Sequence, residues 1–327
     1  MKELRINFTD FWEGFIPEKS LIYQFLSQYY QLSIVPRPDY LFYSCMGYNY
    51  LNYPDSVRIF YTGENLVPDF NMCDYGMGFH HLQFEDRYLR FPLFLIHKGC
   101  WDELERLGGE KDVTPELAQR KFCNFVYSRN KQQTDPLRED FFMKLSEYKK
   151  VDSGGRYLNN IGGPVADKLD FIKQYKFTIA FENSPVSGYA TEKIIDPMRV
   201  NSLPVYYGDP CISTDFNPAS FVWVKDRQSM DAAIEEIIRL DRDDEAYLNK
   251  LRQPWFSKDI QAFYTNELLR FFRNIFDQPK EKAFRTTRFG YVGIYQRDLK
   301  RTAPLSKNYI FNKIWGAIDK LSAIKTK

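Results

Sequence analysis

Short apolar runs alternate along the chain with polar segments that carry glycine or proline. In the N-terminal part these runs predict strands over residues 4–8, 32–35, 40–45 and 57–61 and a helix over residues 20–28. Further on they predict strands over residues 123–127, 177–181, 203–207 and 221–224. Helical spacing of apolar residues predicts helices over residues 165–175, 192–200, 230–240 and 263–276 and one that begins at Pro136. Because strands and helices alternate in both halves, the pattern indicates an α/β protein.

Two glycine-rich turns mark the middle of the chain. Ser153–Arg156 reads SGGR and Ile161–Pro164 reads IGGP, and such glycines are typical of turns between structural units. We therefore predict an N-terminal domain over residues 1–150, a second domain over residues 151–279 and a C-terminal tail over residues 280–327. At 327 residues the chain is long enough for two cores.

Composition adds little to this picture, apart from an aromatic content of 17%. Aromatic side chains suit sugar-binding clefts, but they also fill ordinary cores. The five cysteines are scattered without CxxC or zinc-ligand spacing, which predicts buried thiols. The N-terminal residues lack the pattern of a secretion signal, and no apolar run approaches the ~20 residues that cross a bilayer. These features predict a reduced, cytoplasmic setting.

Charge is distributed unevenly along the chain. From Lys280 onward twelve lysines and arginines face three acidic residues, so this part has a net charge of +9 and the rest of the chain −7. The negative body argues against a nucleic-acid partner.

The end of the tail predicts a basic amphipathic helix. Apolar residues at helical spacing are Ile310, Phe311, Ile314, Trp315, Ile318, Leu321 and Ile324, with Lys307, Lys313, Lys320 and Lys325 among them. Such a helix either lies on an anionic membrane surface or docks on the protein's own body, and the pattern is compatible with both.

Two places along the chain suggest chemistry. Glu64 follows the strand predicted over residues 57–61, and open α/β sheets bind ligands at the carboxyl ends of their strands. Thr191 is a good N-cap for the helix over residues 192–200, and Lys193 lies in its first turn. Backbone N–H groups at a helix start, together with a lysine, favour a phosphate. The alternative for Lys193 is a solvated position on a surface helix.

Several motifs resemble those of one enzyme family. The strand–loop–helix unit reads FENSPVSGYATEKI (Phe181–Ile194) and is followed by PVYYG (Pro204–Gly208). Four further stretches match in order: YTGEN (Tyr61–Asn65), FNMCDYGMGF (Phe70–Phe79), EDRYLRFPL (Glu85–Leu93) and LNNIGGPVADK (Leu158–Lys168). Together they resemble the bacterial α1,3/4-fucosyltransferases of glycosyltransferase family 10, which decorate lipopolysaccharide with Lewis-type epitopes.

The resemblance implies a GT-B architecture, in which two Rossmann-like domains face each other across a cleft. The first domain would hold the acceptor and the catalytic base, and the second domain would bind GDP-fucose. The implied reaction is an inverting transfer of L-fucose to O3 of GlcNAc in Gal-GlcNAc ends of lipopolysaccharide O-antigen or related glycans. No metal is expected in the chemical step, and Mn²⁺ is expected to do no more than stimulate. The alternatives are another GT-B nucleotide-sugar transferase and a non-catalytic glycan-binding protein.

An acceptor assembled on a membrane lipid would place the protein at the inner face of the cytoplasmic membrane, in contact with it through the basic tail. The sequence leaves three points open: the linkage, α1,3 or α1,4; the preferred acceptor; and whether the chain forms a homo-oligomer.

Carried over to this chain, the resemblance implies that Glu64 is the general base for the acceptor hydroxyl. The alternative for Glu64 is a turn-stabilising carboxylate that accepts backbone hydrogen bonds. Arg138 and Lys193 would neutralise the diphosphate, Arg138 by a bidentate fork and Lys193 as a point charge.

The remaining donor-site residues also come from the loop after residue 181. Tyr189 and Glu192 match positions that hold the nucleotide sugar, Glu192 through ribose or fucose hydroxyls, and Asn183 would shape the loop. Glu182 either stabilises positive charge on the fucose ring or is a buried, hydrogen-bonded structural carboxylate.

We predict no metal site. Asp241-Arg242-Asp243 imitates the DxD motif of metal-dependent glycosyltransferases, but it lies at a helix boundary in a charged run, where carboxylates suit a helix N-terminus. The histidines, His80, His81 and His97, lack ligand spacing. His80 also stands where relatives are expected to carry an acidic residue, which weakens any inference about the acceptor.

Overall fold

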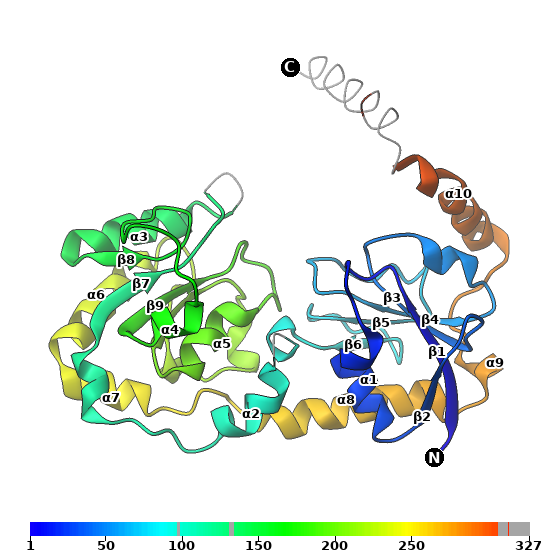
Figure 1. The fold of residues 1–327 in the computed structure, drawn as a ribbon, viewed down its shortest axis with the longest axis horizontal. Coiled ribbons are helices and arrows are strands. Elements are labelled where there is room, and N and C mark those ends of the chain that lie inside the picture. Colours follow the sequence, from blue (N-terminus) through cyan, green and yellow to red (C-terminus); the bar gives the residue numbers. More distant parts are fainter. Residues whose placement is uncertain (97–98, 131–133, 307–312, 314–327) are drawn as a thin grey trace. The chain divides into compact units, whose positions relative to one another are not determined.

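The computed structural model describes residues 1–96, 99–130, 134–306 and 313 (Figure 1). Its chain forms two compact units, each built on one sheet. The first comprises Met1–Gly78, Gln83–Leu89 and the described residues from Arg270 onward, and the second comprises Phe79–Leu82 and Arg90–Leu269.

The first unit has a six-stranded sheet with the order β2-β1-β3-β4-β5-β6. Its strands are β1 (Glu3–Thr9), β2 (Gln31–Ile34), β3 (Tyr40–Tyr43), β4 (Val57–Tyr61), β5 (Tyr75–Gly78) and β6 (Tyr88–Arg90). β1 to β5 pair with their neighbours in parallel, so their carboxyl ends lie at one edge. β3 and β4 are buried along their whole length, as expected for a parallel sheet covered on both faces.

Two helices cover one face of this sheet, α1 (Leu21–Ser27) and the C-terminal end of α8 (Ile260–Phe276) (Figure 1). Ser20 caps α1 by accepting a hydrogen bond from the Tyr23 N–H. The rings of Phe25 on α1 and Phe42 on β3 both contact Phe272 on α8. These aromatic contacts form part of the core of the first unit.

The second unit has a five-stranded sheet with the order β11-β10-β9-β7-β8, in which neighbouring strands are parallel. Its strands are β7 (Lys121–Phe125), β8 (Val151–Ser153), β9 (Tyr175–Phe181), β10 (Leu203–Tyr207) and β11 (Val222–Trp223). Figure 1 shows helices α3 to α7 around this sheet. The helices of this part are α2 (Cys100–Gly108), α3 (Leu137–Tyr148), α4 (Lys168–Ile172), α5 (Glu192–Arg199), α6 (Met230–Arg242) and α7 (Asp244–Leu251).

The predicted α/β organisation is confirmed, but the units divide elsewhere than predicted. β7 pairs with β9 and therefore belongs to the second sheet, although it precedes residue 150. The chain passes back from the second unit to the first inside α8, at residue 270 rather than at the predicted boundary of residue 279. The reason is that the end of this helix packs on the first sheet. The glycine-rich turns after β8 are therefore loops within the second unit and do not separate domains.

The acidic triplet Asp241-Arg242-Asp243 has structural roles. Asp243 caps α7 by accepting a hydrogen bond from the Ala246 N–H at 2.9 Å. Asp241 accepts hydrogen bonds from Tyr148 and Lys149, each at 3.0 Å.

The predicted tail begins with α9 (Lys280–Ala283) and α10 (Gly290–Ser306), which belong to the first unit. Gln296 on α10 accepts a hydrogen bond from Arg58 and donates one to the Asn71 carbonyl, so this helix docks on the body. The amphipathic helix expected beyond residue 306 lies outside the described residues, apart from the exposed Lys313. Within the described ranges, every helix is too short or too polar to cross a membrane.

A buried carboxylate attaches the segment between α9 and α10 to the first sheet. Asp74, just before β5, is fully buried, and its Oδ1 accepts hydrogen bonds from the backbone N–H groups of Arg285 and Thr286 and from the Thr286 hydroxyl, each at 2.8 Å. Its Oδ2 accepts from the Arg58 N–H at 2.9 Å and forms an ion pair with Arg288 at 3.2 Å. Each carboxylate oxygen thus accepts at least two hydrogen bonds.

Replacing Asp74 should therefore destabilise the first unit strongly. We expect Asp74→Ala to lower the free energy of unfolding by about 3–5 kcal/mol, because it removes the only carboxylate that pairs with Arg288 within the described residues and leaves several N–H groups without their acceptor. Urea denaturation followed by circular dichroism measures this change. Asp55→Ala removes an exposed carboxylate nearby and should change it by no more than about 0.5 kcal/mol. Equal effects of the two substitutions would contradict the role of Asp74.

Candidate active site

The carboxyl edge of the second sheet carries a polar pocket of about 270 Å³. The segments after β7 and β9 and the start of α5 supply most of its wall, because parallel strands direct these segments to the same edge. The lining residues are Val126, Tyr127, Ser128, Arg129, Arg138, Lys168, Thr178, Ile179, Asn183, Glu192 and Lys193. Four of the six residues assigned to the donor site or fucose site thus line one pocket.

Arg138 is held rigidly in the wall of this pocket. It lies in the first turn of α3, is 2% exposed, and its guanidinium carbon sits 4.1 Å from the centroid of the Tyr127 ring. One terminal nitrogen, Nη2, donates to the Glu182 carbonyl at 2.9 Å and to the Asn183 side-chain oxygen at 2.8 Å. Nε and Nη1 are buried and have no hydrogen-bond partner among the described residues. Burial lowers the pKa of Arg138, but an arginine stays charged at neutral pH.

Lys193 is held by a buried carboxylate. Its Nζ lies 3.0 Å from Glu182 Oε2 and 3.0 Å from the Thr191 hydroxyl, and 3.5 Å from Glu192 Oε1. Burial acts against the ammonium form, but the charges of Glu182 and Glu192 more than offset this effect, so the pKa of Lys193 is raised. A lysine in this setting remains a fixed positive charge at the wall of the pocket.

Glu182 is a positioning residue. It is fully buried, and its Oε1 accepts from the Thr191 N–H at 2.8 Å while both of its oxygens accept from the Thr191 hydroxyl at 2.9 Å. Burial raises the pKa of its carboxyl, and the Lys193 ammonium opposes this effect. With its oxygens bound to Thr191 and Lys193, Glu182 fits the second of the two roles expected for it, that of a buried structural carboxylate.

Gly208 is required by the position of Glu182. A Cβ on this glycine would lie 2.4 Å from Glu182 Cγ and 2.9 Å from the Tyr206 hydroxyl. The glycine that ends PVYYG therefore makes room for the carboxylate that anchors Lys193.

Tyr189 is the expected donor-site residue that the pocket does not include. It is half-buried, and its ring packs 5.1 Å from that of Phe79. Its place in the second unit is therefore beside the segment Phe79–Leu82.

Sequence reasoning overlooked several residues of the pocket, above all two cations. Arg129 comes soon after β7, and its place at a strand end was the available signal. Lys168 ends the motif LNNIGGPVADK and begins α4, where it pairs with Asp196 at 2.7 Å. Arg129, Arg138, Lys168 and Lys193 together give the pocket a positive wall suited to an anion.

Glu64 belongs to the first unit, where it follows the carboxyl end of β4. Its backbone N–H donates to the Thr62 hydroxyl at 3.1 Å, and its side chain is exposed. Within the described residues, the Glu64 carboxylate accepts no hydrogen bond and forms no ion pair.

An aromatic group lies at the same edge of the first sheet, after β1. The rings of Phe11 and Phe15 stack at 4.1 Å, and Trp12 contacts both rings edge-on. The Trp12 side chain is 53% exposed. Because β1 and β4 point the same way in this sheet, Trp12 and Glu64 follow strand ends at one edge.

The histidines have different surroundings. The ring of His80 stacks on Phe79 at 4.1 Å, whereas His97 lies outside the described residues. His81 lies near Asp209 and Cys211, and all three residues belong to the second unit. This grouping could not be predicted from local patterns, because His81 and Asp209 are far apart along the chain.

Two family models match the chain. The model of the alpha-(1,3)-fucosyltransferase FucT N-terminal domain matches residues 6–97. The model of the glycosyltransferase family 10 (fucosyltransferase) C-terminal part matches residues 117–266.

Among individual proteins, Alpha-(1,3)-fucosyltransferase FucT of Helicobacter pylori is 35% identical over 301 residues, which cover 80% of this chain and 62% of that protein. This chain therefore spans less than two thirds of the length of that relative.

Solved structures agree with this likeness. A crystal structure of an alpha1,3-fucosyltransferase with GDP has 32% identity and a TM-score of 0.70, and covers 85% of this chain and 91% of its own. The structure with GDP-fucose has 31% identity and a TM-score of 0.69, and the match covers 85% of this chain and 92% of that one. The expected GT-B class of α/β fold is confirmed by these neighbours. Both family models match, and the match to the solved fucosyltransferase with GDP covers 91% of that protein's chain. This chain therefore belongs to glycosyltransferase family 10, the fucosyltransferases.

Proposed function

We propose that this chain is an inverting α1,3-fucosyltransferase that transfers L-fucose from GDP-fucose to a sugar hydroxyl. The relatives named above carry this activity in their names, and two of the solved structures hold GDP or GDP-fucose. The single observation that carries the proposal is the pair of buried, unpartnered donors on Arg138, in the same pocket wall as Lys193. Buried donors without a partner are costly, and an anionic ligand would remove that cost.

The pocket suits a nucleoside diphosphate. Nε and Nη1 of Arg138 are two buried donors left for phosphate oxygens, and Lys193 adds a point charge at the first turn of α5. The N-terminus of that helix adds its positive dipole end. During transfer, negative charge grows on the leaving diphosphate, and these fixed positive groups stabilise it without having to reorient. Glu192 would bind ribose or fucose hydroxyls from the same wall.

Glu64 is the proposed general base. Its carboxylate takes the proton of the acceptor hydroxyl as this oxygen attacks fucose C1, and a single displacement inverts the configuration at that carbon. An exposed carboxylate without internal partners suits this role, since nothing in the described chain competes for the incoming hydroxyl proton.

The proposed acceptor is a Gal-GlcNAc end of lipopolysaccharide O-antigen or a related glycan, with fucose joined to O3 of GlcNAc. The Phe11, Trp12 and Phe15 group supports a sugar acceptor, because the C–H face of a pyranose packs on exposed aromatic rings, and this group shares an edge with Glu64. We further propose that the enzyme works at the inner face of the cytoplasmic membrane, with the basic end of the chain in contact with anionic lipid.

The transfer step itself is proposed to need no metal ion, since Arg138 and Lys193 supply the positive charge that Mn²⁺ supplies in other glycosyltransferases. A rival within the same fold is a transferase of another nucleotide sugar. Transfer from GDP-mannose or a UDP-sugar, without transfer from GDP-fucose, would decide for that rival.

Glu64→Gln should abolish most of the transfer while leaving the donor site intact. We expect kcat to fall by about 10²–10⁴-fold, the usual contribution of a general base, with an unchanged Kd for GDP. Rates come from GDP release and affinity from calorimetry. Glu18→Gln, an exposed glutamate of the same unit, is the control and should keep wild-type rates. Full activity of Glu64→Gln would refute the assignment of the base.

Arg138→Lys keeps a positive charge but removes the two unpartnered guanidinium donors. We expect the Kd for GDP to rise by about 10–100-fold, as charge-assisted hydrogen bonds are lost. Isothermal titration calorimetry measures the change, and Arg106→Lys, at an exposed position on α2, should leave the Kd unchanged. An unaltered Kd in Arg138→Lys would exclude this pocket as the diphosphate site.

Trp12→Ala tests the acceptor side separately. We expect the KM for a Gal-GlcNAc acceptor to rise by about 10-fold, corresponding to roughly 1.4 kcal/mol of lost ring–sugar contact, with an unchanged KM for GDP-fucose. Phe289→Ala removes another exposed aromatic side chain of the first unit and is the control. A rise in the donor KM instead would place Trp12 at the nucleotide sugar.

A further inference from the structure

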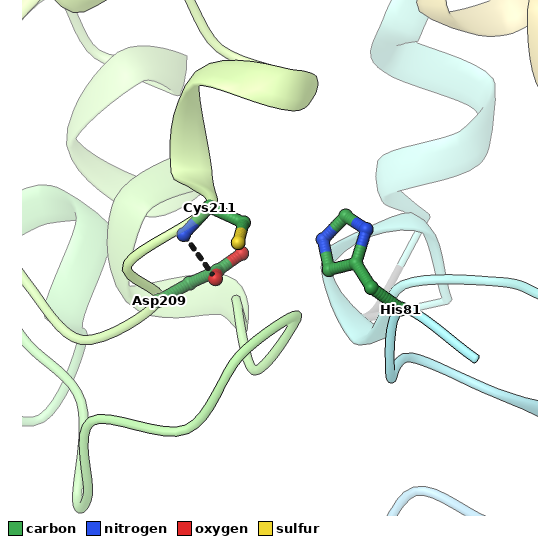
Figure 2. A group of neighbouring side chains, drawn as sticks. All are labelled: His81, Asp209 and Cys211. Carbon is green, nitrogen blue, oxygen red and sulfur yellow. Dashed lines mark hydrogen bonds between the residues drawn. The ribbon is translucent and has the colours of Figure 1, made fainter.

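Three side chains typical of metal sites come together in the second unit, away from the pocket wall. His81, Asp209 and Cys211 each offer one ligand atom, and these atoms lie within 4.8 Å of one another (Figure 2). His81 belongs to the segment Phe79–Leu82, whereas Asp209 and Cys211 follow the carboxyl end of β10. Figure 2 shows the imidazole facing the carboxylate and the sulfur from the opposite side.

We propose that His81, Asp209 and Cys211 bind a zinc ion. Imidazole, thiolate and carboxylate are the three ligand types that proteins use for Zn²⁺, and three protein ligands leave a fourth tetrahedral position for water. Binding releases the thiol proton of Cys211 to solvent. One thiolate and one carboxylate then balance the two positive charges of the ion, so the site needs no further counter-charge.

Asp209 is already oriented for this role. It is 1% exposed, and its Oδ1 accepts hydrogen bonds from the N–H groups of Gly188 at 2.8 Å and Cys211 at 2.7 Å. Within the described residues, its Oδ2 accepts no hydrogen bond, which leaves this oxygen for a ligand beside the thiol and the imidazole. A metal ion would provide a partner for this second oxygen of the carboxylate.

The surroundings also hold Cys211 and balance the nearby charges. The Ser187 hydroxyl donates to Cys211 Sγ at 3.4 Å, the kind of outer hydrogen bond that orients a metal ligand. Two cations, Arg90 and Lys258, act on His81, but both pair with Asp215, at 2.7 Å and 3.5 Å. Asp215 therefore offsets one of these two positive charges, and the Asp209 carboxylate and the Cys211 thiolate would face the ion directly.

The segment that carries His81 packs closely on the loop between β9 and α5, residues 182–191, here called the donor loop. A Cβ on Gly188 would lie only 2.1 Å from the Phe79 carbonyl oxygen, and Tyr189 packs on the Phe79 ring. The proposed ion would therefore link residues 79–82 to the loop after β10 and, through Asp209 and Cys211, to residues 187–188 of FENSPVSGYATEKI. Its role is that of a structural cross-link beside the donor loop, distinct from the chemistry of transfer.

The ligand set discriminates between metals. Mn²⁺ and Mg²⁺ prefer oxygen ligands, whereas a thiolate favours zinc. An excess of Mn²⁺ should thus fail to displace Zn²⁺ from the full-length protein.

The test is equilibrium dialysis of the metal-free full chain against Zn²⁺, followed by elemental analysis and competition with a chelating indicator. We expect one Zn²⁺ per chain in the wild type. Cys211→Ser should weaken binding by more than ~100-fold, because loss of an outer partner alone costs roughly 10–100-fold. Substitution with Co²⁺ gives a second readout, a thiolate-to-cobalt charge-transfer band that Cys211→Ser must lack.

Matched controls are available within the chain. Cys45→Ser removes another half-buried thiol, and His80→Gln removes the neighbouring imidazole. Both should keep one Zn²⁺ per chain, while His81→Gln should weaken binding as Cys211→Ser does. Zinc should also raise the Tm of the wild type but not that of Cys211→Ser. The proposal is overturned if the wild type binds no zinc, if the controls lose it equally, or if Cys211→Ser retains wild-type affinity.

Discussion

The buried carboxylate of Glu182 is the interaction on which the candidate site depends. It sits at the end of a fully buried strand, and its oxygens bind the cap residue of α5 and the lysine in the first turn of that helix. Its backbone carbonyl accepts from Arg138, so one residue positions two of the pocket's cations, Arg138 and Lys193. A carboxylate without these partners would be too costly to bury, and thus the partners and the carboxylate require one another.

The two parallel sheets determine where chemistry can be placed. Parallel strands bring all their carboxyl ends to one edge, and loops there are free of the hydrogen-bond ladder. In the second unit, this edge collects Arg129 after β7, Glu182 and Asn183 after β9, and Asp209 after β10. In the first unit it collects the aromatic group after β1 and Glu64 after β4.

Much of this arrangement could be predicted from the sequence, because long apolar runs specify buried strands. β4 and β10 were predicted to the residue, and the cap of α5 was recognised from Thr191. β5 and β6 were missed, since YGMG and YLR are too short for a clear pattern. The domain boundary predicted at residue 150 was wrong because β7 pairs with β9, and such a long-range contact leaves no local pattern in the sequence. The grouping of His81 with Cys211 was unforeseeable for the same reason, whereas Lys193 was found through its motif and Arg138 through the family resemblance.

The attachment of residues 285–288 to Asp74 has a consequence for shortened versions of this chain. A version that ends before Arg285 would keep every strand of both sheets, yet it would expose a carboxylate whose five donors include four from the deleted part. The apparent end of the α/β fold at α8 is therefore not the end of the folding unit. A shortened chain for domain dissection, crystallisation or fusion design should extend at least to Arg288. Residues 285–288 belong to the first unit and pack against it, although they are far along the chain from its sheet.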